Sequence, residues 1–106
     1  KQSMDLVVDI YNVTGNFPKS EIYGLTSQVR RSAVSVPSNI AEGAGRSSDL
    51  DFKHFLHYSY GSSCELDTQL IIANRLRMLD DKTYLGLFNQ IDQNQKMLYN
   101  LIEKFT

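Results

Sequence analysis

Two histidines and a lone cysteine are the side chains in this sequence best suited to metal or nucleophilic chemistry. His54 and His57 lie three positions apart, a helical spacing that suits a metal pair, and Cys64 follows seven positions after His57. A metal site needs further ligands, and the Glu-x-x-His pairs that di-iron bundles use are absent from the chain. Nothing near Cys64 marks an oxyanion site. We therefore expect surface or core-edge histidines, a small buried cysteine, no metal, no cofactor, no small-molecule substrate and no enzymatic activity.

A short glycine loop is a stronger candidate for ligand binding. Residues 43–48 read Gly-Ala-Gly-Arg-Ser-Ser and precede an expected helix start, where free N–H groups favour anions. Phosphate binding is one interpretation of this loop. The other is helix punctuation, in which glycines end one helix and a serine caps the next. We favour punctuation, because the motif is short and is not a P-loop.

Two adjacent arginines lie upstream of that loop. Arg30 and Arg31 leave a helix about 100° apart, so they cannot both point directly away from the core. In a structural interpretation, which we favour, one of them pairs with Glu42 or Glu65 and fixes the register of two helices. In a functional interpretation, the arginines contact phosphates. The candidate residues for a nucleic-acid or oligomer contact are Lys19, Arg30, Arg31, Ser38, Asn39, Glu42, Arg46 and Lys53.

The helix that carries most of these candidates contains a proline. Thr26 is a good N-cap residue for it. Its apolar stripe steps by three or four residues through Leu25, Val29, Ala33, Val36, Ile40 and Ala44. Pro37 lacks an N–H and costs a helix interior about 3 kcal/mol, so the helix is either kinked but continuous or broken at Val36. We predict the kinked, continuous helix because the stripe keeps its phase, and we expect Gly43 and Gly45 to end it.

Helical periodicity also accounts for the rest of the chain. We expect one helix over about residues 2–14, one of about 30 residues after the N-cap Ser48, and one after Asp80 with a heptad seam. The apolar positions that recur along the first helix are Met4, Val7, Ile10 and Val13, together with Leu6 and Tyr11. No alternating strand pattern occurs. Four helices with short loops predict an all-α fold, an antiparallel up-and-down four-helix bundle formed by residues 1–106 as a single domain.

The third expected helix carries more apolar surface than a monomeric bundle needs. Residues 70–73, Leu-Ile-Ile-Ala, are apolar nearly all round, which predicts a partner. Residues 61–63, Gly-Ser-Ser, form a small-residue patch where another helix can approach closely.

Composition limits the partner and the compartment. The chain has 106 residues, 42% of them hydrophobic and 22% charged, with a net charge of −1. It therefore has no overall attraction to nucleic acid or an anionic membrane, and any basic face must be local. No apolar run approaches the roughly 20 residues that span a bilayer. Cys64 is the only cysteine, which excludes an intrachain disulfide and fits a reducing cytoplasm. We expect a cytoplasmic protein without membrane contact.

Several motifs carry a resemblance to a known family. They are Gly-Leu-Thr-Ser-Gln at 24–28, Arg-Arg at 30–31, Ser-Val-Pro-Ser-Asn-Ile-Ala-Glu-Gly at 35–43 and Gly-Arg at 45–46. Residues 17–19, 51–52, 55–56, 61–63 and 65–66 fit the same pattern. Together they closely resemble the four-helix-bundle proteins related to those encoded by 23S ribosomal RNA intervening sequences.

The resemblance implies a small bacterial cytosolic bundle that often forms a ring-shaped homopentamer. It does not imply an enzyme, since the family's role is largely undefined. A related group accompanies reverse transcriptases of diversity-generating retroelements and binds nucleic acid through a basic pentamer surface. This chain departs from that group by its net negative charge.

Two functional hypotheses follow from the residues and the resemblance. The first is a non-enzymatic, self-assembling helical bundle that acts as a scaffold or adaptor, and the apolar third helix motivates it. The alternative is an RNA- or DNA-binding module that uses the arginines and the glycine loop on an oligomeric ring.

Overall fold

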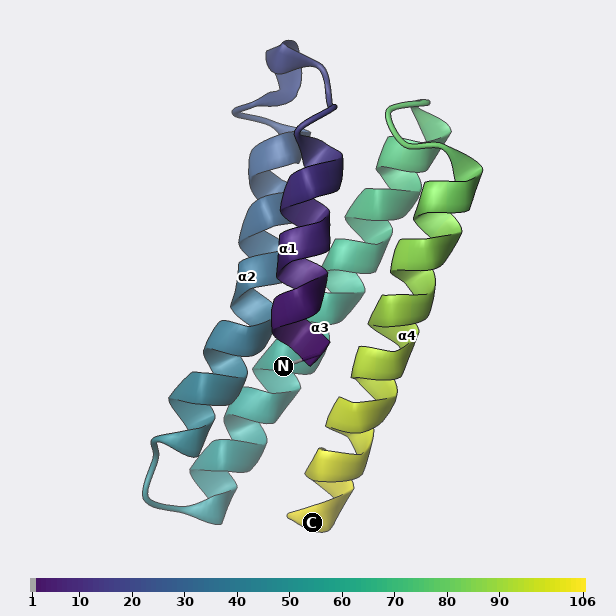
Figure 1. The fold of residues 1–106 in the computed structure, drawn as a ribbon. Coiled ribbons are helices and arrows are strands. Elements are labelled where there is room, and N and C mark those ends of the chain that lie inside the picture. The colour runs from purple at the N-terminus through teal and green to yellow at the C-terminus, as the bar shows by residue number, and fades with distance from the viewer. Residues whose placement is uncertain (1) are drawn as a thin grey trace.

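The computed structural model describes residues 2–106, which form four α-helices and one short 3-10 helix. In chain order the elements are α1 (Gln2–Thr14), η1 (Lys19–Glu21), α2 (Leu25–Ala44), α3 (Asp49–Arg75) and α4 (Asp81–Lys104). Over this range the chain contains no strand. The predicted all-α fold with four helices is confirmed (Figure 1).

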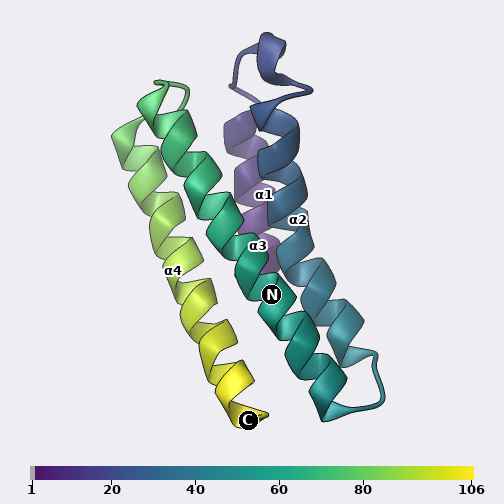
Figure 2. The same cartoon turned by 180° about the vertical axis from the view of Figure 1, so that it is seen from behind.

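Successive helices run in opposite directions, so the bundle is up-and-down (Figure 1). Each helix packs against the next one in the chain, and α1 closes the bundle against α4 (Figures 1 and 2). The helices therefore follow the order α1, α2, α3, α4 around the bundle, and the α1–α2 edge lies opposite the α3–α4 edge. The long axis measures 43 Å. Within residues 2–106, none of the helices combines the length and the apolarity that a membrane crossing requires.

The first helix is too short to line the whole bundle. Its 13 residues give a length of about 20 Å, whereas the 24 residues of α4 give about 36 Å. A core cluster that includes Leu6, Ile10, Val29 and Leu70 lies where all four helices pack. A second cluster around Leu56, Leu98 and Ile102 is supplied by α2, α3 and α4 alone. One half of the bundle is therefore built from three helices.

The side of α1 that is buried differs in part from the side that the sequence predicts. Leu6 and Ile10 are buried, and so are the polar residues Ser3 and Thr14 at the two ends of the helix. Met4, one of the apolar positions that recur along the helix, is 62% exposed. The periodicity was ambiguous because α1 carries apolar residues on nearly all sides, and packing selects the face that Leu6 and Ile10 share.

The helix starts agree with the sequence in two cases out of three. Ser48 caps α3 by accepting from the backbone N–H of Asp51 at 3.1 Å, and Asp80 caps α4. The expected N-cap Thr26 is wrong, because α2 begins earlier, with Gly24 as its N-cap residue. Glu21 Oε1 accepts from the backbone N–H of Leu25 at 3.2 Å and so satisfies this helix end. Thr26 is buried inside the first turn.

The second helix runs through its proline without interruption. Residues 25–44 form one helix with Pro37 inside it, so the alternative of a break at Val36 is excluded. The kink itself stays a prediction. The helix ends at Gly45, whose φ of −83° any residue can adopt. Gly43 lies within the helix and has a packing role instead: a Cβ built there would lie 2.7 Å from Phe55 Cβ.

The third helix is shorter than expected and ends without glycine. It stops at Arg75, after 27 residues, and the chain then turns through Arg77 at a φ of 64°. Met78 N–H donates to the carbonyl of Ala73 at 2.9 Å, and Arg77 N–H donates to that of Asn74 at 3.1 Å. This is a Schellman termination with arginine at the position that glycine usually takes.

Candidate functional site

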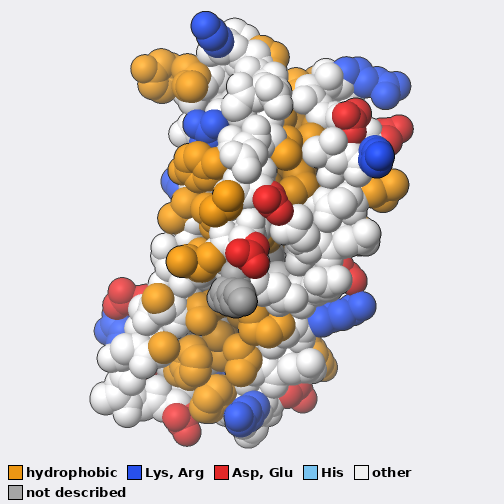
Figure 3. All heavy atoms as spheres, viewed as in Figure 1, with side chains coloured by type: hydrophobic (Ala, Val, Ile, Leu, Met, Phe, Trp, Pro, Cys, Tyr) orange, Lys and Arg blue, Asp and Glu red, His pale blue; other side chains and the backbone are white. Residues whose placement is uncertain are grey.

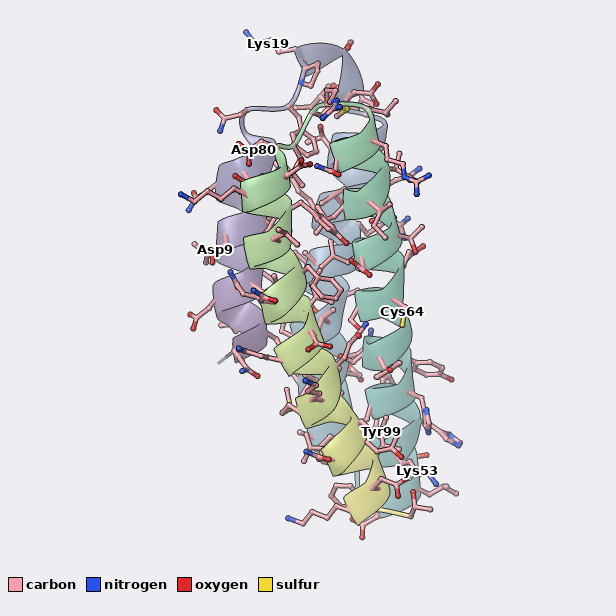
Figure 4. The ribbon with its side chains drawn as sticks, turned by 90° about the vertical axis from the view of Figure 1, so that its right-hand side faces the viewer. Asp9, Lys19, Lys53, Cys64, Asp80 and Tyr99 are labelled. Atoms are coloured by element: carbon pink, nitrogen blue, oxygen red, sulfur yellow. The ribbon has the colours of Figure 1, made fainter. Side chains whose placement is uncertain are left out.

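The eight predicted contact residues do not form one surface. Lys19 lies in η1 at one end of the bundle, and Lys53 lies near the opposite end (Figure 4). The remaining six lie on or directly after α2, and Arg46 is in the α2–α3 connection, at the same end of the bundle as Lys53. The predicted residues therefore do not form a single basic patch within one copy of the chain.

Arg30 packs against α1 and not against a carboxylate. Its Nε donates to Thr14 Oγ1 at 2.8 Å, and its guanidinium lies 4.6 Å from the ring centroid of Tyr11. The predicted pairing of Arg30 or Arg31 with Glu42 or Glu65 is wrong. The reason is the position of Arg30 on the α1 side of α2, which directs it away from α3.

Each carboxylate of that hypothesis has a different partner. Glu42 forms an ion pair with Arg46 at 2.8 Å, across one turn, and Arg46 also lies 4.8 Å from the ring centroid of Phe55. Glu65 accepts from the hydroxyl of Ser32 at 3.1 Å. Both partners of the Glu42 pair are about half exposed, so screening by solvent leaves it a small contribution to stability.

Small polar side chains join α2 to α3 around the proline. Ser59 donates to the carbonyl of Val36 at 2.8 Å, in a fully buried position. The hydroxyls of Ser35 and Ser62 lie 2.8 Å apart. Asn39 Nδ2 donates to the carbonyl of Ser35 at 2.8 Å. Asn39, a candidate contact residue, thus bonds its own helix, while Arg31 and Ser38 are exposed.

The glycine loop functions as helix punctuation. Ser48 satisfies the first turn of α3, and Asp49 and Asp51 lie in that same turn. These carboxylates already complement the positive end of the helix and oppose a second anion there. The serine cap of the favoured interpretation therefore agrees with the geometry, whereas Gly43 lies inside α2 and packs against α3 instead of ending the helix.

The histidine and cysteine residues do not form a metal cluster. Within residues 2–106 no group of three or more His, Cys, Asp or Glu side chains could hold a metal ion. His54 and His57 are exposed. Cys64 was expected to be buried, and this prediction is wrong: it is exposed, and Gln95 Nε2 lies 3.6 Å from its sulfur. A turn of 100° per residue places Cys64 well away from the buried Leu66 of α3.

Two side chains near the α3–α4 turn have shifted pKa values. Partial burial, followed by the charge of Asp67 and a 3.2 Å hydrogen bond to it, raises the pKa of Tyr84. The hydrogen bond from the backbone N–H of Thr83, supported by the Thr83 side chain, lowers the pKa of Asp80. Both residues connect elements of the bundle, and neither belongs to a cluster of reactive groups.

An apolar groove lies between α1 and α2. It has a volume of about 390 Å³, and none of its lining residues is ionisable; they are Met4, Val7, Val8, Val34, Pro37, Ser38 and Ala41. A second hollow of about 380 Å³ shares Met4, Pro37 and Ala41 and extends towards Met97 of α4. We call the seven residues that line the first hollow the α1/α2 groove.

Exposed apolar side chains border this groove. Met4, Val8 and Tyr11 are 62%, 58% and 44% exposed, and they share the outer side of α1. Figure 3 shows hydrophobic side chains gathered over α1 and the adjoining part of α2, and again between α2 and α4 beyond the first turn of α1. The first hollow lies beside α1, and the second lies near the start of α1, where the bundle continues with three helices.

Sequence reasoning missed the groove, although a signal was present. Val8 lies on the side of α1 opposite the buried Leu6 and Ile10, and polar residues were expected there. An apolar residue on that side indicates a second contact surface. The partner surface was instead expected on α3, where Leu70 and Ala73 are buried inside the bundle and Ile72 is 45% exposed.

Comparison with known proteins identifies the family. A family model described as "23S rRNA-intervening sequence protein" matches residues 1–100. The chain belongs to the 23S rRNA-intervening sequence protein family. The resemblance seen at residues 24–46 is thereby confirmed. No curated protein matches the chain.

A solved structure shows the same fold. It is a protein of unknown function from the S23 ribosomal protein family of Bacteroides thetaiotaomicron, and it matches with a TM-score of 0.89 and 22% sequence identity. The match covers 95% of this chain and 94% of that protein. At this identity the likeness shows the fold alone and carries no activity over to this chain.

Proposed function

We propose that this protein is a non-enzymatic helical bundle that assembles with copies of itself and acts as a scaffold or adaptor. The observation that supports this most is the α1/α2 groove with its exposed apolar border. Met4, Val8, Tyr11 and Val34 leave on the order of 400 Å² of side chain in solvent, a patch size that on monomers often marks an interaction site.

The groove suits a protein surface better than the other ligand classes. Nucleic acid requires Lys or Arg at the contact, and the groove has no ionisable lining residue. An anionic membrane surface favours an apolar helix face flanked by basic residues, whereas the polar residues of α1 include Asp5 and Asp9. Apolar side chains from another copy of the protein need no basic residue in or beside the groove, so they fit this surface.

Light scattering on the purified chain tests the proposal. We expect a molar mass that is a multiple of 12.1 kDa at micromolar concentration. We also expect the mass to persist as salt is raised, because an apolar contact is not weakened by ionic screening. A stable 12.1 kDa species under these conditions would remove the proposal.

We further propose that the assembly is the homopentamer that the family resemblance implies and that it is cytoplasmic. A pentamer predicts a mass of five times 12.1 kDa in the same measurement. The free, exposed thiol of Cys64 supports the cytoplasmic location, because a reducing compartment keeps such a thiol unoxidised.

Nucleic-acid binding remains the alternative, but the geometry favours it less. Arg30 and Arg46 already contact α1 and Glu42, and Lys19 and Lys53 lie far apart (Figure 4). A ring could gather such residues from several copies. Binding of structured RNA at low salt that falls steeply as salt rises would support this alternative. Absence of binding with the oligomer intact would exclude it.

A further inference from the structure

The bundle exposes a second apolar surface on the side opposite the groove. Leu85, Phe88 and Tyr99 of α4 are 56%, 38% and 57% exposed. Spacings of three and eleven residues place all three within about 60° on one side of the helix. We call these residues the α4 ridge.

Hydrogen bonds between helices place the ridge at the α3–α4 edge. Tyr84 bonds Asp67 of α3, and Gln95 bonds Ser63 of α3, so this side of α4 faces α3. The opposite side of α4 faces α1, where Gln90 bonds Asp9. The ridge therefore lies beside α3, at the edge diagonally across the bundle from the α1/α2 groove (Figures 1 and 2).

We propose that the α4 ridge of one copy docks in the α1/α2 groove of the next, so that copies join head to tail. This inference rests on the proposed self-assembly and names the two surfaces that form it. A symmetric contact of groove with groove would leave the ridge in solvent. A head-to-tail contact covers both apolar surfaces with a single interface, and its repetition closes a ring when the rotation permits.

The dimensions and charges of the two surfaces agree. Residues 34–44 of α2, along which the two hollows run, span about 15 Å, and residues 85–99 of α4 span about 21 Å. Asp92 and Lys96 lie on the same side of α4, between Phe88 and Tyr99, and form an ion pair with each other at 3.1 Å. Neither surface therefore brings a net charge to the contact.

Single charged substitutions test each surface. Val34→Glu and Ala41→Lys introduce opposite charges into the groove at exposed positions, and Leu85→Glu does so on the ridge. We expect each variant to keep its helical circular dichroism and to fall to 12.1 kDa. The matched control is Tyr23→Glu, which alters a side chain that is 95% exposed and outside both surfaces, and it should keep the mass of the unsubstituted protein.

A mixing experiment distinguishes the head-to-tail contact from a symmetric one. Val34→Glu retains an intact ridge and Leu85→Glu an intact groove, so their mixture can form one contact and no more. We expect the equimolar mixture to give a complex of twice 12.1 kDa, while each variant alone remains monomeric.

Other results have definite meanings. If the unsubstituted chain is a monomer, the proposed function fails and this inference fails with it. An unsubstituted oligomer whose mass survives both groove substitutions overturns the inference alone. Groove variants that become monomers while Leu85→Glu stays oligomeric, or a mixture that stays monomeric, would also overturn it, in favour of a symmetric contact or a different partner.

Discussion

Gly43 gives the sharpest test of how α2 packs on α3. A Cβ added there would lie 2.7 Å from Phe55 Cβ and 2.9 Å from Phe52 Cδ1. Carbon atoms in proteins pack best at about 3.5–4.0 Å, so the two helices would have to separate locally by about 1 Å. The Phe52 ring can rotate, but Phe55 Cβ is fixed to its backbone. Gly43→Ala therefore forces a displacement of the helix itself.

The expected magnitude is the difference between two effects. Overpacking a tight contact costs about 1–3 kcal/mol, and replacing glycine by alanine within a helix gains up to about 1 kcal/mol. Gly43 is the penultimate residue of α2, and displacement of the last turn relieves part of the strain. We therefore expect Gly43→Ala to lower the unfolding free energy by about 1–2 kcal/mol, or the melting temperature by roughly 5–10 °C.

The chain supplies a matched control for the same chemical change. Gly61 lies inside α3 and is exposed, and a Cβ added there would have no neighbouring atom within 4 Å. Gly61→Ala should raise the unfolding free energy by about 0.5–1 kcal/mol, because only the helix propensity changes. Urea unfolding at one fixed protein concentration measures both variants, since self-association makes stability concentration-dependent. The packing of α2 on α3 would be refuted if Gly43→Ala changed the unfolding free energy by the same amount as Gly61→Ala, or if Gly43→Ala were the more stable of the two variants.

Three further predictions concern the helix connections. Arg30→Ala should lower the unfolding free energy by about 1.5–3 kcal/mol because it removes a charged hydrogen bond to α1, whereas Arg31→Ala should change it by no more than about 0.5 kcal/mol. Urea unfolding compares the two variants, and equal losses of stability would contradict the contact assigned to Arg30. Arg77→Gly should raise the unfolding free energy by about 0.5–1 kcal/mol, because glycine adopts the positive φ without strain. As a control, Arg75→Gly inside α3 should lower it by about 1 kcal/mol, and thermal unfolding measures both variants. Because the pKa of Asp80 is lowered, its cap stabilises the fold above about pH 4 and is lost as the pH falls through the lowered value. Asp80→Asn should therefore flatten the acid limb of stability against pH, and an unchanged limb would contradict the capping role.

Local signals predicted most of the fold. Ser48 and Asp80 each place a side-chain oxygen beside free N–H groups, and this short-range chemistry can be recognised in sequence. The continuity of α2 through Pro37 followed from the phase of its apolar stripe. These predictions held because each depends on residues within one or two turns of one another.

The failures concern interactions between helices. Thr26 has the side chain of an N-cap residue, but the helix starts before it, and Glu21 accepts the hydrogen bond at the N-terminus of α2. The pattern predicts a carboxylate partner for Arg30 or Arg31, but Arg30, on the α1 side of the helix, contacts a hydroxyl and an aromatic ring. The groove depends on how α1 packs beside α2, and Val8 alone indicates only that α1 has a second apolar side. Such features are decided by tertiary packing, and periodicity alone does not contain them.

Sedimentation equilibrium of the unsubstituted chain over a range of micromolar concentrations tests self-assembly most directly. Association through the apolar surfaces predicts one species whose mass is a multiple of 12.1 kDa and holds on dilution and at high salt. A mass of 12.1 kDa at every concentration would contradict the account, because the groove and the ridge would then be surfaces that a monomer leaves exposed.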